Sequence, residues 1–198
     1  MLPDRDKWKS LVEIHYMTKA LLLKAEEIDH DHEFYYPPLV QQRDTLEHIM
    51  RAAFALFYPE DFKKTVVGEG QDVSRYATRQ MDKAIGHAYR ALFDAADWLS
   101  IIFREQIHQT LAGYSRQAIN TALPDFTPEA QPKIDAICLQ IAELRNKKDI
   151  GSDDTVISGA EKYTKLVETL EQYWAKVRAA VPLLDLADGF SSSPNSGS

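Results

Sequence analysis

The residue types best suited to chemistry lie together in one short segment, Arg43-Asp44-Thr45-Leu46-Glu47-His48. An imidazole titrates near neutral pH and can act as a general base. A guanidinium group binds phosphate oxygens through two parallel hydrogen bonds. The pair therefore points to chemistry on a phosphate ester. On an ideal helix Arg43 and His48 are about 140° apart, so we expect a partner residue or a distorted turn to connect them.

This segment resembles the Arg-x(4–6)-His signature of HEPN domains, which are compact helical bundles that often dimerise. Many HEPN domains are metal-independent ribonucleases of toxin–antitoxin and antiphage systems. Asp44 fits the polar position that follows the arginine in that family. The resemblance implies that His48 is the general base and that Arg43 stabilises charge on the scissile phosphate, at a dimer cleft. The alternative interpretation is that Arg43 borders the core while His48 is an exposed polar residue.

Other patterns that could carry chemistry give weaker signals. Two Glu-x-x-His pairs, Glu27–His30 and Glu105–His108, have the spacing of di-iron ligands in helical bundles. Both pairs fall away from the apolar side of their predicted helices, so we expect them to face outward and to bind no metal. Cys138 lies on an apolar stripe, where a cysteine usually acts as a small hydrophobic residue. The sequence has no glycine-rich phosphate loop and no G-x-S-x-G motif, and we expect no cofactor.

The charge balance limits the possible partners. The chain has 198 residues and a net charge of −7, and we therefore expect no general coating of DNA or RNA, which depends on many lysines and arginines. The central segment, residues 71–123, is the one part that is not acidic, so a small local RNA site is compatible with the sequence. The start of the chain lacks a secretory signal, and no stretch approaches the ~18 apolar residues of a membrane span. These features predict a cytoplasmic protein without membrane association.

Hydrophobic residues recur at three- and four-residue steps, the spacing of one helical face. In the first helix this predicts an inward stripe of Leu11, Ile14, Thr18, Leu21, Ala25 and Ile28. In the last helix it predicts a heptad seam of Ala160, Tyr163, Val167, Leu170, Trp174, Val177, Val181 and Leu184. The sequence thus predicts an all-α fold, a single up-and-down bundle of about five helices over residues 1–188, followed by a disordered tail at 189–198. The helices are expected at residues 5–29, 38–58, 73–114, 127–149 and from 158 onward. Residues 59–71 are expected to form a loop.

Several local signals define these helices in more detail. Gly86 is a candidate kink in the long third helix, and Thr127 is expected to cap the fourth with Pro128 at its first position. Ser158 and Glu161 have the spacing of a capping box at the start of the last helix, which Pro182 should end or bend. The inner face of the second helix is predicted to consist of Leu39, Leu46, Met50, Ala53 and Phe57.

Two functions remain open at this point. The first is an RNA-binding or metal-independent RNA-cleaving module that uses Arg43 and His48 in a homodimer of the HEPN type. The second is a non-catalytic accessory bundle that binds another protein through a helical surface. Trp98 and Ile101 point away from the apolar stripe of the third helix, so they are the candidate interface residues. Either function is compatible with a homodimer.

Overall fold

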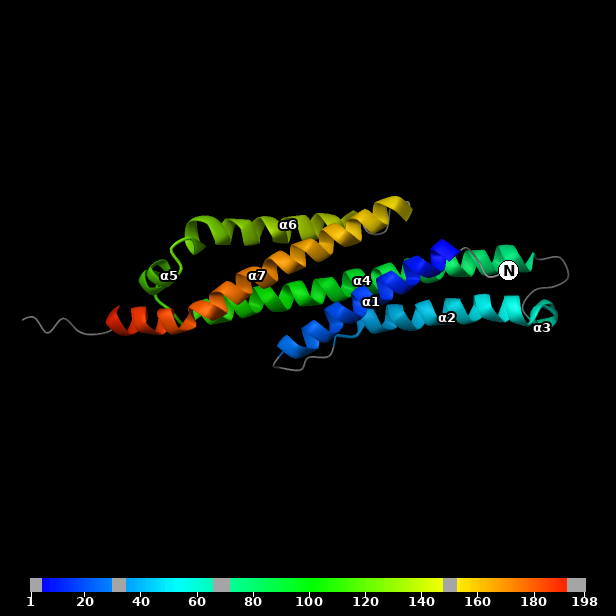
Figure 1. The fold of residues 1–198 in the computed structure, drawn as a ribbon, viewed down its shortest axis with the longest axis horizontal. Helices are drawn as coiled ribbons and strands as arrows, with labels where there is room; N and C mark the ends of the chain where they lie inside the picture. The colour runs from blue at the N-terminus through cyan, green and yellow to red at the C-terminus, as the bar shows by residue number, and fades with distance from the viewer. Residues whose placement is uncertain (1–4, 30–34, 66–71, 148–152, 192–198) are drawn as a thin grey trace, which may run out of the picture. The chain divides into compact units, whose positions relative to one another are not determined.

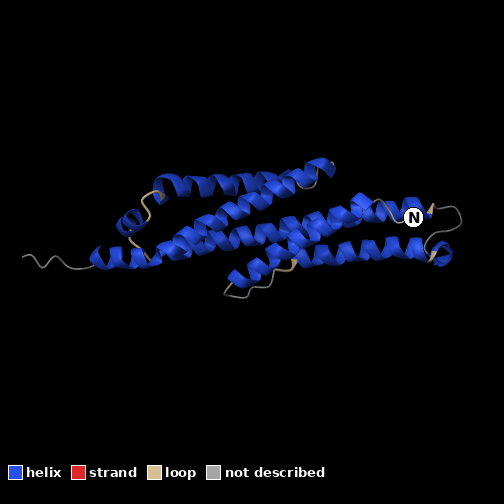
Figure 2. Cartoon of the chain, viewed as in Figure 1, coloured by secondary structure: helices blue, strands red, loops and turns tan. Residues whose placement is uncertain are grey.

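The computed structural model describes residues 5–29, 35–65, 72–147 and 153–191, and these residues form helices and short connections without a strand (Figures 1 and 2). The predicted all-α fold class is therefore confirmed. The helices belong to two compact units, residues 1–98 and residues 99–198. Helix α4 (Val73–Ala112) is continuous across Gly86 and contributes its first part to one unit and its last part to the other.

The first unit contains α1 (Arg5–Ile28), α2 (Pro37–Phe57), α3 (Pro59–Thr65) and α4 as far as Trp98. The apolar stripe predicted for α1 is confirmed, because each of its members is buried: Leu11, Ile14, Thr18, Leu21, Ala25 and Ile28. The loop expected at 59–71 is wrong in its first half, since α3 occupies it. Phe62 of α3 is fully buried against Tyr76 of α4, with ring centroids 4.7 Å apart.

The predicted inner face of α2 is also wrong. The buried residues of α2 are Pro38, Ala52 and Ala55, whereas most of the large apolar side chains point to solvent. The exposed residues include four of the five expected inside, namely Leu39, Leu46, Met50 and Phe57. The fifth, Ala53, is half-buried. The physical reason is that the inward side of α2 is made of small and polar residues, which a search for apolar periodicity does not detect.

The second unit contains the end of α4, α5 (Arg116–Ala122), the π-helical turn η1 (Phe126–Ala130), α6 (Gln131–Lys147) and α7 (Asp153–Ser191). α7 packs against both α5 and α6. Its predicted seam is largely confirmed, because its buried positions include Ala160, Tyr163, Val167, Leu170, Val177 and Leu184. Tyr114, just after α4, donates a hydrogen bond from its hydroxyl to Asp185 of α7, at 2.6 Å.

Several predicted boundaries in this unit need correction. Thr127 is not a helix cap, because it lies inside η1 and its hydroxyl donates to the Asn120 side-chain oxygen at 3.0 Å. α7 begins at Asp153 rather than at Ser158, and it continues past Pro182 to Ser191. Residues 189–191 of the expected tail are therefore helical, and residues 192–198 lie outside the described part of the chain. The short helix α5 was not predicted.

Candidate functional site

Polar side chains gather where α2 and α4 lie side by side in the first unit. On α2, Gln41, Asp44 and His48 follow each other at steps of three and four residues, so they share one side of the helix. On α4, Gln80 and His87 are seven residues apart, which is about two helical turns. We refer to these five residues as the α2–α4 polar cluster. Its three α2 members, Gln41, Asp44 and His48, lie on the inward side of that helix, which the sequence predicted to be apolar.

Two histidines form the centre of the cluster. The rings of His48 and His87 are stacked, with centroids 5.2 Å apart and an angle of 23° between the planes. Each ring is held by a glutamine of the opposite helix. The His48 Nδ1 lies 2.6 Å from Gln80 Oε1, and the His87 Nδ1 lies 2.8 Å from Gln41 Oε1. An amide oxygen accepts, so each Nδ1 donates, and in the neutral ring Nε2 keeps the lone pair that can take a proton.

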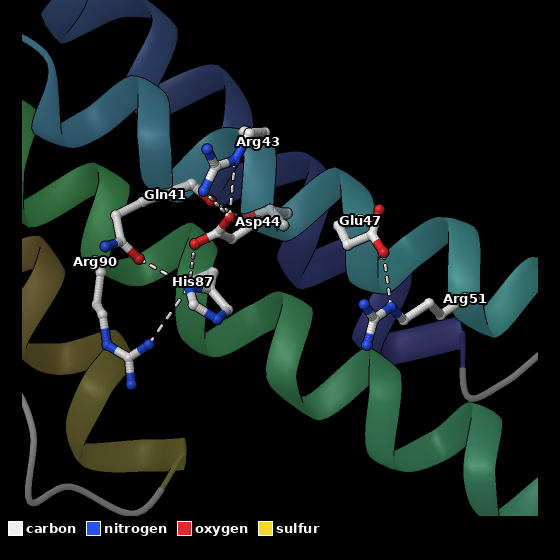
Figure 3. A network of polar contacts seen from close by, with 8 residues as sticks. Gln41, Arg43, Asp44, Glu47, Arg51, His87 and Arg90 are labelled. Atoms are coloured by element: carbon white, nitrogen blue, oxygen red, sulfur yellow. Dashed lines mark hydrogen bonds and ion pairs between the residues drawn. The ribbon is translucent and has the colours of Figure 1, made fainter.

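An arginine–carboxylate pair adjoins the histidines (Figure 3). Arg43 donates to Asp44 Oδ1 from both Nε and one terminal nitrogen, at 3.0 and 2.7 Å. The hydrogen bond from Arg43 and its positive charge lower the pKa of the Asp44 carboxyl, so Asp44 is ionised at neutral pH. The second oxygen of Asp44 lies 4.0 Å from His87 Nδ1. Figure 3 shows Asp44 between Arg43 and the imidazole of His87.

Neighbouring groups shift the pKa of His87 in opposite directions. Partial burial lowers its pKa, and the nearby positive charge of Arg90 lowers it further, whereas Asp44 raises it. The net direction is downward, so burial and the surrounding cations outweigh the carboxylate. Arg90 approaches the ring closely, with a terminal nitrogen 3.5 Å from His87 Nδ1. A positive charge on His48 also lowers the pKa of His87.

The two residues singled out by the sequence occupy different environments within this site. The side chain of Arg43 is 72% exposed, whereas His48 is half-buried against Gln80. This reverses the alternative interpretation, in which Arg43 bordered the core and His48 was exposed. The connection from Arg43 to His48 runs through Asp44 and then through His87. The 140° separation on the helix is thus bridged by partner residues rather than by a distorted turn.

Sequence reasoning missed His87 and both glutamines of the cluster. Gln80 and His87 are polar residues on the side of α4 that faces α2, and the two-turn spacing between them can be read from the sequence. This spacing indicates a site only when the packing of α2 against α4 is known, because each glutamine contacts a histidine far away in the sequence. A histidine of α4 within a few ångströms of His48 could not be identified from one helix alone.

The remaining predicted positions show no comparable arrangement. Within the described ranges, no group of three or more metal-ligand side chains comes together. Glu105 and His108 are exposed, as expected, and His30 lies outside the described residues. Cys138 is half-buried, and Arg104 donates to its sulfur at 3.5 Å.

The two interface candidates are both half-buried. Trp98 stacks on Tyr35, with ring centroids 5.6 Å apart and planes 23° apart, so Tyr35 covers part of its surface. Ile101 lies on the part of α4 that belongs to the second unit. Their role in an interface stays a prediction. None of the helices in the described segments combines the length and the apolar character needed to cross a bilayer.

Comparison of the chain with models of protein families, with curated proteins and with solved structures gives no match. The arrangement of the site is therefore the basis for the functional argument.

Proposed function

We propose that the α2–α4 polar cluster binds RNA and cleaves it without a metal ion, as the resemblance to HEPN domains implies. The stacked pair of His48 and His87 is the observation that carries this proposal. Cleavage of RNA by its own 2′-hydroxyl needs one group to remove a proton and another to deliver one. Two imidazoles a few ångströms apart, each with Nδ1 fixed by an amide, are suited to both transfers.

The proposed reaction divides the proton transfers between the two rings. Nε2 of neutral His48 accepts the proton of the ribose 2′-hydroxyl while the oxygen attacks the adjacent phosphorus. Protonated His87 donates its proton to the 5′ oxygen as the bond from phosphorus to that oxygen breaks. The products are a 2′,3′-cyclic phosphate and a free 5′-hydroxyl. The lowered pKa of His87 makes the protonated ring a stronger acid, but it also reduces the fraction of His87 that carries the proton at neutral pH.

Arg43 is proposed to stabilise the negative charge on the phosphate during the attack. Its side chain is exposed, and its bond to Asp44 holds the guanidinium at a carboxylate that lies next to His87. Lys83 and Arg90 add positive charge, since both lower the pKa of His87. This local positive character lies in a chain of net charge −7. It therefore fits a short stretch of RNA better than an extended nucleic-acid coat.

The test is an RNA cleavage assay in EDTA with total RNA and tRNA, resolved on a denaturing gel. Wild type should cleave, and His48→Ala should lose at least about 100-fold of the rate, the usual contribution of a general base. His108→Ala is the matched control, because His108 is an exposed histidine of the second unit. Its cleavage should equal that of wild type. Equal cleavage by wild type and His48→Ala would contradict the proposal.

A second candidate function is a non-catalytic helical module that binds a protein. The observation that favours it is the row of exposed large apolar residues on α2. If wild type leaves RNA intact in EDTA, this candidate becomes the leading one. A homodimer is part of either proposal, and the position of its interface is a separate question.

A further inference from the structure

The second unit contains a cavity that is lined by the end of α4, by α5, by η1 and by α6. Its volume is about 820 Å³, within the range of about 300–1,000 Å³ that is typical of sites for small molecules. The floor consists of apolar side chains from three of these elements, each less than a tenth exposed: Ile107, Leu111, Phe126 and Ile134. We call it the α4–α6 cavity, and its floor suits the apolar part of a ligand.

A hydrogen bond between two lining residues holds one edge of the α4–α6 cavity. The Thr127 hydroxyl of η1 donates to the side-chain oxygen of Asn120 in α5, at 3.0 Å. The turn η1 is π-helical, with the Ala130 amide donating to the Asp125 carbonyl at 3.1 Å. Single π-helical turns occur frequently at functional sites. The edge formed by α5 and η1 is therefore fixed by side chains of the cavity itself.

Arg104 brings a positive charge to this cavity without a carboxylate to balance it. The side chain is half-buried, and its two contacts are neutral. Nε donates to the Ser100 carbonyl at 3.1 Å, and a terminal nitrogen donates to the Cys138 sulfur at 3.5 Å. In the part of the chain that the structure describes, Arg104 forms no ion pair. A guanidinium has five N–H groups, so three remain for a ligand, and a charge partly removed from water is usually paired with an opposite one.

The charges around the α4–α6 cavity suit a ligand with one negative charge. Arg104 and Arg116 contribute +2 and Asp135 contributes −1, so the formal charge is 2 − 1 = +1 when His108 is neutral. The whole chain, in contrast, has a net charge of −7. A phosphate monoester carries about −1.5 to −2 near neutral pH, whereas a carboxylate carries a single charge. A guanidinium also matches the two oxygens of a carboxylate in a bidentate pair.

We propose that the α4–α6 cavity binds an ionised carboxylic acid with a hydrocarbon chain. The carboxylate accepts hydrogen bonds from Arg104, and the chain lies on the apolar floor. This site goes beyond the proposed RNA cleavage and does not depend on it, because none of its residues belongs to the α2–α4 polar cluster.

Isothermal titration calorimetry of the full chain tests the proposal with sodium decanoate, below the concentration at which decanoate forms micelles. Wild type should bind one decanoate per chain. Octanoate should bind about tenfold more weakly, because two fewer methylene groups leave water. The neutral alcohol decan-1-ol should also bind at least about tenfold more weakly than decanoate, because it lacks the charge that pairs with the guanidinium.

Two variants separate the role of the charge from that of the apolar space. Arg104→Gln removes the charge and should weaken decanoate binding at least about tenfold, to an affinity near that of decan-1-ol. Ala112→Trp places a large ring at an exposed position that lines the cavity, and it should block both ligands. The matched controls are Lys133→Gln and Ala136→Trp, which make the same kinds of change at exposed positions of α6 outside the cavity. Both should bind decanoate like wild type.

Three results would overturn the proposal. Wild type that does not bind decanoate would show that the cavity is not a site for such acids. Equal affinity of wild type and Arg104→Gln would show that the guanidinium does not hold the carboxylate. Undiminished binding by Ala112→Trp would place decanoate elsewhere, for instance on the exposed apolar side chains of α2. Circular dichroism checks the helical content of each variant, and if Arg104→Gln does not fold, Ala112→Trp and the comparison with decan-1-ol decide the outcome.

Discussion

Helices α2 and α7 are both long and both rich in apolar residues, yet they use them in opposite ways. In the second unit, α7 buries large side chains such as Tyr163, Leu170 and Leu184. In the first unit, α2 buries proline and alanine, and its large apolar residues remain exposed. The inward side of α2 instead supplies Gln41, Asp44 and His48 to the polar cluster.

The difference shows how one helix can both pack against its neighbours and present a group of polar side chains. A helix whose one apolar face makes the core, such as α7, has little room for polar side chains on that face. Small residues at Ala52 and Ala55 let α2 approach its neighbours closely, while polar residues earlier in the helix form hydrogen bonds to α4. The outer apolar face of α2 then remains available for a partner. We therefore expect substitutions in the seam of α7 to affect stability most, and we propose that α2 carries the function.

The largest effect is expected in the seam of α7. Leu170 is fully buried, so Leu170→Ala removes buried apolar surface and leaves a cavity. It should lower the free energy of unfolding by about 2–5 kcal/mol. Chemical denaturation followed by circular dichroism measures this change. Leu139→Ala is the matched control on the exposed surface of α6 and should stay within about 0.5 kcal/mol of wild type. Equal losses of unfolding free energy in Leu170→Ala and Leu139→Ala would contradict the claim that the buried seam of α7 stabilises the protein.

A smaller loss of stability, caused by added rather than removed side-chain volume, is expected on α2. Ala55 is fully buried, and Ala55→Leu would force extra side-chain volume into a contact built for a small residue. The expected loss is about 1–3 kcal/mol, measured by the same denaturation. Ala53→Leu adds the same side chain at a half-buried position two residues away and should cost less. If Ala55→Leu stabilised the protein, the close packing of α2 would be refuted.

For helices with one apolar face, the sequence was sufficient to predict which residues are buried. For α1, every predicted core residue is buried, and for α7 most of the predicted seam is. Apolar periodicity predicts the inward side in these helices because burying that side is the main source of stability. The same rule failed for α2, because its apolar pattern describes the outward face.

The candidate site was predictable only in part. Arg43 and His48 were identified through a family resemblance, which named residue types but not their neighbours. His87 belongs to another helix, and its contact with His48 depends on how α2 and α4 pack. Short elements were missed for a related reason. A seven-residue helix such as α3 has too few turns for a periodic signal, and it is held by the burial of Phe62.

The stability of the protein should depend modestly on pH through His87 of the first unit. The pKa of His87 is lowered in the folded protein, so the unfolded chain binds a proton more readily. Stability from this residue is therefore unaffected well above its ordinary pKa of 6.5 and falls as the pH drops from there toward the lowered value. His87→Gln should remove this part of the pH dependence in denaturation midpoints measured between pH 7.5 and 5. An unchanged slope in His87→Gln would show that other groups cause it.

The smallest effect on stability is expected for Arg43. Its side chain is mostly exposed, and surface ion pairs contribute little. Arg43→Ala should leave the denaturation midpoint within experimental error, while RNA binding at low salt weakens measurably in fluorescence anisotropy. Lys133→Ala, which removes a paired cation from α6, is the control and should not affect RNA binding. A large loss of stability in Arg43→Ala would mean that this arginine is structural.

The most direct test of the central claim is the RNA cleavage rate of His87→Ala, compared with those of His48→Ala and the double variant. The account predicts that each single change abolishes most of the cleavage and that the double change adds little, because the two rings act as one unit. Full cleavage by His87→Ala would contradict it, since the pairing of the two histidines across α2 and α4 would then have no part in the reaction.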